Sequence, residues 1–156
     1  MEIMKYRNVN TNANCNDAGS HTIGQSRCTS FKQRLYNQSG NGLPDSTLDK
    51  PYYAQLKSKC PKSGGDNNLS PLDFVSPTKF DNYYFKHLIS EHGLLNSDEE
   101  LFAKGKGKTM ELVKTYAENE DLFFKQFAVS MVKMGNIKPL TGTKGEIRLN
   151  CRAVLG

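Results

Sequence analysis

The chain has 156 residues, of which 37% are hydrophobic and 24% charged, a balance typical of one globular domain with its own core. The net charge is +5, but the basic residues are scattered between acidic ones, so the composition does not favour a nucleic-acid-binding protein. No run of about 18 apolar residues occurs, which excludes an ordinary membrane-spanning helix.

The first 17 residues are polar and rich in asparagine, with no helical or strand period after Ile3. A segment of this composition cannot bury enough apolar surface to fold by itself. We therefore expect residues 1–17 to form a disordered arm that differs from the rest of the chain, and residues 18–156 to form the domain.

Apolar residues recur at helical spacing along most of the remaining chain. No stretch alternates convincingly as a strand, and residues 62–77 are predicted to be a long loop rich in Gly, Asn, Ser and Pro. The expected fold is all-α with long loops. Helices are predicted from Cys28 to the turn at 37–42, from a capping box of Ser46 and Asp49 to Pro61, from a Thr78 cap to Gly93, from Ser97 to Phe102, over 108–117, and over 121–134 with Phe123, Phe124, Phe127, Met131 and Met134 at buried spacings.

The four cysteines include no C-x-x-C pair, which argues against a zinc site, and their wide spacing is typical of disulfides in an oxidising compartment. Two glycosylation sequons begin at Asn37 and Asn68 and agree with secretion. Residues 1–14, however, contain no apolar stretch resembling a signal peptide, so the two indications conflict.

The segment at 18–28 surrounds His21 with small and hydroxyl residues, among them Gly19 and Thr22. Small neighbours allow a large planar ligand to approach the backbone, and an imidazole nitrogen can bind a metal. A lone histidine is nevertheless more often a core or surface residue than a ligand, so this segment alone leaves both roles open.

Four segments resemble one family, in the family's own order: GSHTIGQSRC at 19–28, KSKCPKSGGDNNLSPLDFVSPTKFDNYYFKHL at 57–88, GLLNSDEELF at 93–102 and FAVSMVKMGNIKPLTGTKGEIRLNC at 127–151. The chain is similar to the plant secretory (class III) haem peroxidases, from about residue 18 to residue 151. This resemblance implies a haem-peroxidase-like helical domain, truncated here to the proximal, C-terminal half. The proximal side is the haem face on which the protein ligates the iron.

The resemblance implies haem b as cofactor, with His21 as the axial ligand of its iron. It also implies that Asp98, in the Ser97-Asp98 motif, accepts the second ring N–H of His21, which orients the imidazole and makes it more electron-rich. Taken alone, Asp98 would be interpreted as a helix cap.

A second set of residues matches the family's proximal calcium site. Calcium takes six to eight oxygen ligands, and carboxylates, hydroxyls and carbonyls suit it. Ser76 stands where the family usually has threonine, which keeps the hydroxyl. On spacing alone Asp73 and Asp81 would be loop and helix-start residues. The implied ligands are Thr22, Asp73, Ser76 and Asp81, with the Lys79 carbonyl.

The resemblance also pairs Cys28 with Cys60 in a disulfide. The family partner of Cys151 belongs to the N-terminal half, and Cys15 has no counterpart, so these two cysteines are expected to be unpaired or bonded to each other. The remaining histidines, His87 and His92, have no catalytic role in the family pattern and are expected at the surface.

The implied function is hydrogen peroxide-dependent oxidation of phenolic or similar aromatic donors, with peroxide removal and a role in oxidative stress. The distal histidine and arginine of the family have no match in this chain, so little turnover is expected of the chain alone. The alternative is a non-catalytic fragment that binds calcium or haem. We expect a monomer that is secreted, extracellular or vacuolar, without nucleic-acid or membrane partners.

Overall fold

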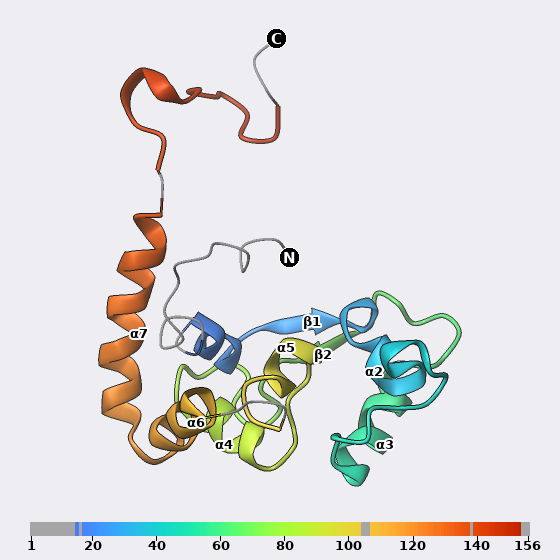
Figure 1. Cartoon of the computed structure of the whole chain (residues 1–156). Helices are drawn as coiled ribbons and strands as arrows, with labels where there is room; N and C mark the ends of the chain where they lie inside the picture. The colour runs from blue at the N-terminus through green and yellow to red at the C-terminus, as the bar shows by residue number, and fades with distance from the viewer. Residues whose placement is uncertain (1–14, 16, 104–106, 138, 154–156) are drawn as a thin grey trace.

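The structure is a computed structural model that describes residue 15 and residues 17–103, 107–137 and 139–153. It is mainly helical with long connections, as predicted (Figure 1). Most of the predicted arm at 1–17 lies outside the described residues. The elements in chain order are η2 (Gly19–Thr22), β1 (Gln25–Arg27), η3 (Cys28–Ser30), α2 (Lys32–Tyr36), η4 (Gln38–Gly40), α3 (Lys50–Lys59), β2 (Leu69–Pro71), α4 (Tyr83–Ile89), α5 (Asn96–Glu99), α6 (Lys108–Glu118), α7 (Glu120–Gly135) and η5 (Gly142–Lys144), where η marks a 3-10 helix.

Asparagine and aspartate side chains begin two of the longer helices. The Asp49 carboxylate accepts a hydrogen bond from Tyr52 N at 2.9 Å at the start of α3, so the predicted capping box with Ser46 as cap is wrong by one turn. The Asn119 side chain accepts from Leu122 N at 2.9 Å and begins α7. Both side chains satisfy backbone donors that the first helical turn leaves free.

The helix predicted after Thr78 is shorter at both ends. It begins at Tyr83. The Asp81 carboxylate accepts a hydrogen bond from Tyr83 N at 2.9 Å, and this local turn takes the place of the first predicted helical residues. It ends at Ile89, and Glu91 follows with a left-handed backbone angle, φ 61°. Gly93, predicted to end this helix, instead lies in the turn that leads into α5.

A short antiparallel pair of strands, which the sequence analysis did not predict, connects the two ends of the molecule. Ser26 of β1 faces Ser70 of β2 in the register. Three residues are too few to show an alternating pattern, and Pro71, which has no backbone N–H, is the last residue of β2. The predicted loop at 62–77 is therefore paired in its middle with the strand that follows His21.

The buried apolar side chains form two clusters, one at each end of the strand pair (Figure 1). The first lies among α4, α6 and the start of α7; the second surrounds α2 and α3 and includes both cysteines of the disulfide. The members of the first are Cys15, Ala18, Tyr84, Phe85, Leu88, Val113, Tyr116, Ala117 and Phe123. The members of the second are Cys28, Phe31, Leu35, Leu48, Tyr52, Leu56, Cys60 and Leu94.

Helix α7 leaves the first cluster after its initial turns and carries the C-terminal segment away from the body (Figure 1). Of the side chains predicted to be buried along it, only Phe123 is fully buried, and Met134 is 37% exposed. The apolar spacing therefore predicted the helix correctly but not how far its apolar face is covered. Among the described residues, no helix combines the length and apolar character needed to cross a membrane.

Candidate functional site

His21 lies in η2, directly between the first apolar cluster and strand β1. Its Nδ1 is 2.8 Å from Oδ1 of Asp98, which is completely buried in α5, 77 residues further along the chain. The His21 side chain remains 28% exposed. The structure therefore brings together the two residues that the resemblance paired.

The position of η2 depends on close packing against the first cluster. A Cβ atom added to Gly19 would lie 2.5 Å from Cε2 of Phe123, a distance that requires one of the two to move, and 3.1 Å from Cζ of Phe85, which is also a tight contact. Glycine therefore allows the backbone two residues before His21 to lie directly on aromatic rings. This contact fixes the depth at which His21 enters the site.

The hydrogen bond to Asp98 decides which ring nitrogen of His21 is available. Burial lowers the pKa of His21, but the hydrogen bond and the negative charge of Asp98 raise the pKa above its ordinary value overall. In the neutral ring, Nδ1 keeps the proton that it shares with Asp98, and Nε2 carries the lone pair. Within the described part of the chain, Nε2 has no hydrogen-bond partner, so it is free to bind a metal.

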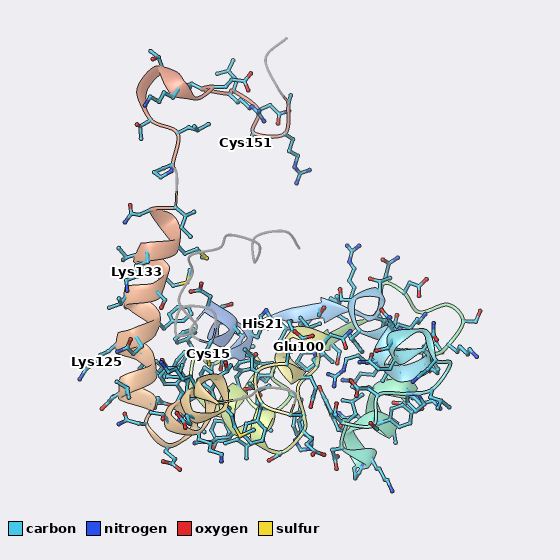
Figure 2. The ribbon with its side chains drawn as sticks, in the orientation of Figure 1. Cys15, His21, Glu100, Lys125, Lys133 and Cys151 are labelled. Atoms are coloured by element: carbon cyan, nitrogen blue, oxygen red, sulfur yellow. A yellow bond between two sulfur atoms is a disulfide. The ribbon has the colours of Figure 1, made fainter. Side chains whose placement is uncertain are left out.

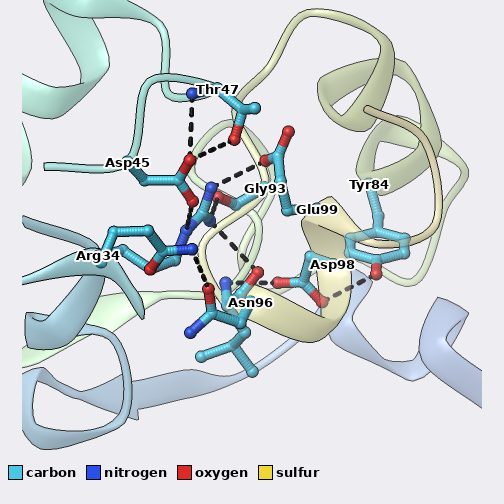
Figure 3. Close-up of polar contacts among 10 residues, drawn as sticks. Arg34, Asp45, Thr47, Tyr84, Gly93, Asn96, Asp98 and Glu99 are labelled. Atoms are coloured by element: carbon cyan, nitrogen blue, oxygen red, sulfur yellow. Dashed lines mark hydrogen bonds and ion pairs between the residues drawn. The ribbon is translucent and has the colours of Figure 1, made fainter. Parts of the chain in front are cut away.

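Tyr84 is a member of this site that the sequence analysis assigned only to the core. Its hydroxyl donates to Oδ1 of Asp98 at 2.9 Å (Figure 3). Its ring meets the His21 ring edge-on at a centroid distance of 5.9 Å. Leu95 N donates to the other oxygen of Asp98 at 2.8 Å. Burial and the neighbouring Asp98 charge raise the pKa of Tyr84 well above its ordinary value, so the phenol stays a hydrogen-bond donor.

The side chains predicted to bind calcium also lie close together. Oδ1 of Asp81 is 3.2 Å from Oγ1 of Thr22 and 3.1 Å from Oγ of Ser76, and Ser76 Oγ is 3.5 Å from Oδ2 of Asp73. Both carboxylates are buried. Oδ2 of Asp81 is buried without a hydrogen-bond partner, and its nearest cationic group is Lys79 Nζ at 3.8 Å.

This oxygen cluster is poor in charged ligands. Among the residues that the structure describes, no group of three or more His, Cys, Asp or Glu side chains is placed to hold a metal ion. The cluster offers only the two carboxylates of Asp73 and Asp81, so a cation there would depend on hydroxyl and carbonyl oxygens for its other ligands.

The two other histidines, expected at the surface, are partly buried. His87 Nδ1 is 3.0 Å from Oδ1 of Asp73, with 13% of its side chain exposed, and His92 Nε2 is 3.3 Å from Oδ1 of Asp49. Both imidazoles also pack against the Phe74 ring, at centroid distances of 4.8 and 5.2 Å. Packing against Phe74 explains why both imidazoles are partly covered, and their positions on and after α4 gave no sign of it.

The contact with His87 affects the Asp73 carboxyl. Burial raises the pKa of Asp73, but the adjacent His87 imidazole and hydrogen bonds from the backbone N–H groups of Val75 and Ser76 lower the pKa below its ordinary value overall. Asp73 is therefore held as a carboxylate in a loop whose backbone already turns around it. Its sequence position gave no indication of the histidine partner.

A buried arginine lies next to this site and was also missed. Arg34 is completely buried and donates to Asp45 and Glu99, the latter being the residue that follows Asp98 (Figure 3). Burial raises the pKa of Glu99, and Arg34 only partly offsets this effect. An arginine at a helical position is ordinarily exposed, so nothing in the sequence marks Arg34 as buried.

The predicted disulfide is confirmed, since Cys28 and Cys60 are bonded with their Cα atoms 5.6 Å apart. Cys15 and Cys151 are both free. Figure 2 shows Cys15 in the body near His21 and Cys151 in the segment beyond α7. Burial raises the pKa of Cys15 to about 12, so at neutral pH its thiol is protonated and inert.

Comparison with known proteins identifies the group to which these features belong. Residues 18–119 match the family model described as Peroxidase. The chain is 64% identical over 137 residues to Peroxidase 15 of Arabidopsis thaliana and 66% identical over 137 residues to Peroxidase 72 of the same plant, each match covering 88% of this chain and 40% of the relative. It is 49% identical over 138 residues to Peroxidase RIP1 of Medicago truncatula, again covering 88% of this chain and 40% of the relative. The chain thus spans about 40% of the length of these relatives.

Proposed function

The chain belongs to the plant peroxidase family, and on that premise we propose that it forms the proximal side of a haem peroxidase. The proposed reaction is the oxidation of phenolic or similar aromatic donors by hydrogen peroxide, which also removes the peroxide. The observation that carries this proposal is the hydrogen bond between His21 Nδ1 and the buried Asp98 carboxylate. This bond leaves the second ring nitrogen for the iron.

The residues around His21 fit a haem. The imidazole is partly exposed, its Nε2 has no partner among the described residues, and small residues precede it along the chain. Haem, when bound, supplies the redox chemistry of the reaction. His21 would hold the iron through Nε2, while Asp98 accepts a hydrogen bond from Nδ1–H and makes the imidazole a stronger electron donor.

Tyr84 and Leu95 support this arrangement from the far side of Asp98. Each donates one hydrogen bond to the carboxylate, so Asp98 is held at the distance and angle that His21 requires. Together with the His21 ring N–H, these donors give both oxygens of the buried carboxylate a hydrogen-bond partner. The chain's own contribution is therefore a pre-oriented, electron-rich iron ligand.

We further propose that calcium binds among Thr22, Asp73, Ser76 and Asp81. Two buried carboxylates lie within reach of one hydroxyl, and one oxygen of Asp81 has no hydrogen-bond partner; both features favour a cation at this position. Thr22 directly follows His21, so a bound ion would tie the loop at 62–77 to the iron ligand. Calcium should accordingly raise both the midpoint of thermal unfolding and the affinity for haem.

The proposed reaction also requires residues on the opposite, distal face of the haem. Peroxide cleavage requires a base that moves a proton and a cation that stabilises the developing charge. The family's distal histidine and arginine have no match in this chain. We therefore propose that the proximal residues described here act together with a distal side, in a monomeric protein of an oxidising, extracellular or vacuolar compartment. The disulfide supports this compartment, because such bonds persist where the medium is oxidising.

A second candidate is a non-catalytic fragment that binds haem or calcium. The observation in its favour is the proximal site, where the His21–Asp98 pair is intact and the family's distal histidine and arginine have no match. The two candidates differ in turnover, not in haem binding. Where haem is bound, both require His21 to hold the iron.

The test is a titration of the purified chain with haem, with and without calcium, followed through the Soret absorption band. Wild type should give a protein-specific band, and His21→Ala should lose it. His92→Asn is the matched control, since it removes another half-buried imidazole but keeps a hydrogen-bonding side chain. Donor oxidation is then compared with free haem at equal concentration. Turnover like that of free haem is expected of the chain alone, because the family's distal histidine and arginine have no match in it. Turnover that rises far above free haem when the remaining part of a relative such as Peroxidase 72 is supplied supports the catalytic candidate, and turnover that stays at the level of free haem supports the fragment. Equal haem binding by His21→Ala would contradict haem ligation through His21 in either candidate.

A further inference from the structure

The helix that carries Asp98 cannot hold that residue in place by itself. Helix α5 has only four residues, and so short a helix is not stabilised by its own hydrogen bonds. The turn before it is tightly packed as well. A Cβ atom added to Gly93 would lie 3.1 Å from Cβ of Asp98 and 3.4 Å from Oε2 of Glu99. The position of Asp98 therefore depends on contacts from elsewhere in the fold.

One side chain supplies contacts on both sides of Asp98. Nη1 of Arg34 donates to the carbonyl oxygens of Gly93 and Leu95, the latter at 3.2 Å, and Nη2 donates to Oε2 of Glu99 at 2.8 Å (Figure 3). The guanidinium thus bonds both to the backbone that precedes α5 and to the side chain of the last residue of the helix. A planar group with five donors in a fixed fork suits this task, whereas an ammonium is a single point charge.

Arg34 is itself anchored to the second apolar cluster. It lies in α2, and its Nε donates to Oδ2 of Asp45 at 2.9 Å. Asp45 N donates back to the Arg34 carbonyl at 2.7 Å, and the Thr47 hydroxyl donates to the other carboxylate oxygen of Asp45 at 2.6 Å. Arg34 therefore links α2, in the disulfide-bonded part of the chain, to α5, which carries the Asp98 carboxylate that accepts the hydrogen bond from His21.

We propose that Arg34 is a positioning residue for the Asp98–His21 pair. It contacts neither His21 nor the Asp98 side chain, but it fixes the backbone before and after Asp98, so that Oδ1 of Asp98 meets His21 Nδ1. The proposal deepens the proposed function and rests on it where haem is concerned. The part that concerns the hydrogen bond between Asp98 and His21 holds for the chain without haem.

The charges in this cluster guide the choice of variants. Arg34 lies among two buried carboxylates, Asp45 and Glu99, so its complete removal would leave both without a counter-charge and endanger the fold. Arg34→Lys keeps the charge and loses the fork. Glu99→Met removes one grip on α5 and leaves Arg34 with Asp45 as a neutral pair. Arg27→Lys, at an exposed arginine of β1, is the matched control.

Two measurements on the full chain separate positioning from general stability. In the haem-free protein, the Nδ1–H proton of His21 is followed by NMR, because its hydrogen bond to Asp98 protects it from exchange with water. In the haem-loaded protein, the dissociation constant comes from a Soret titration, and resonance Raman spectroscopy gives the iron–imidazole stretching frequency. Circular dichroism at the same temperature establishes that each variant is folded. Asp98→Asn provides the reference for a bond to His21 that has lost its charged acceptor.

The expected result is loss or broadening of the His21 Nδ1–H signal in Arg34→Lys. We expect haem affinity to fall about tenfold, the low end of the range for partners behind a metal ligand, with a shift of the iron–imidazole frequency towards that of Asp98→Asn. Glu99→Met should show smaller changes in the same direction, and Arg27→Lys none.

A folded Arg34→Lys that keeps the wild-type proton signal and haem affinity would overturn the proposal. If Arg34→Lys does not fold, Glu99→Met decides by the same criteria. Should His21→Ala bind haem as wild type does, the proposed function fails, while the proton signal of the haem-free chain still decides whether Arg34 positions Asp98.

Discussion

Replacing Asp98 by asparagine is the sharpest single perturbation of the site, because the two side chains have almost the same shape. Asp98 accepts three hydrogen bonds, from His21 Nδ1 and the Tyr84 hydroxyl at one oxygen and from Leu95 N at the other. Asparagine has one acceptor oxygen and one NH₂ donor. If the oxygen faces His21 and Tyr84, the NH₂ group meets Leu95 N–H, and two donors face each other in a buried site.

The energetic cost follows from this mismatch. One hydrogen bond to a charged acceptor is lost, at about 1.5–3 kcal/mol, and a buried donor is left without a partner, at about 1–3 kcal/mol. Because these costs overlap when the side chain rotates or shifts, we expect Asp98→Asn to lower the free energy of unfolding by about 2–4 kcal/mol. The remaining bond to His21 also loses its charge assistance, so haem affinity should fall about 10–100-fold.

The assay is chemical denaturation of the haem-free chain, followed by circular dichroism, together with a haem titration of the same samples. Asp66→Asn is the control, since Asp66 is an exposed carboxylate that pairs with Lys32 at the surface, and its loss should change stability by less than about 0.5 kcal/mol. If Asp98→Asn matched this control in both stability and haem affinity, Asp98 would not be the centre of the network.

Three further predictions concern the surroundings of the site. Reduction of the disulfide between Cys28 and Cys60, which are 32 residues apart, should lower the free energy of unfolding by about 3–4 kcal/mol in denaturant titrations with and without reductant; an unchanged midpoint would contradict this. Gly19→Ala should cost about 1–3 kcal/mol, measured in the same way, because the new Cβ would collide with Phe123; stability equal to wild type would show that η2 can move. In the haem-free chain, NMR titration should give His21 a pKa above 6.5, so the stability gained from its protonation is fully present below pH 6.5 and is lost as pH rises through the folded-state pKa; a pKa at or below 6.5 would contradict this.

The helical elements were largely predictable from the sequence, because apolar periodicity and polar caps are local properties. The two C-terminal helices were predicted within one residue at each end, as α6 and α7 show. The start of α4 was not predicted correctly. It depends on the Asp81 carboxylate, which accepts hydrogen bonds from Tyr83 N and from the Thr22 and Ser76 hydroxyls, and these are tertiary contacts. The exposed face of α7 was also missed, since periodicity identifies an apolar face but not what covers it.

The pairing of His21 with Asp98 was available from the sequence only through family resemblance. The two residues are 77 positions apart, and no periodicity relates positions so distant. Their supporting residues were missed for a related reason. In the sequence, Tyr84 looks like a core aromatic residue and Arg34 like a surface cation. Only the fold shows that Tyr84 donates to the buried Asp98 carboxylate and that Arg34 donates to Glu99 of the same helix.

The central claim, that His21 holds the haem iron through Nε2, is tested most directly by replacing its imidazole with a free one. His21→Gly should lose the protein-specific Soret band, and added imidazole should restore it, because the cavity left by the ring still ends at Asp98, which can accept the N–H of the free ligand. Restoration in His21→Gly, and its absence in the double variant His21→Gly with Asp98→Ala, is the result that this account predicts. Haem binding by His21→Gly that equals wild type without imidazole would contradict it.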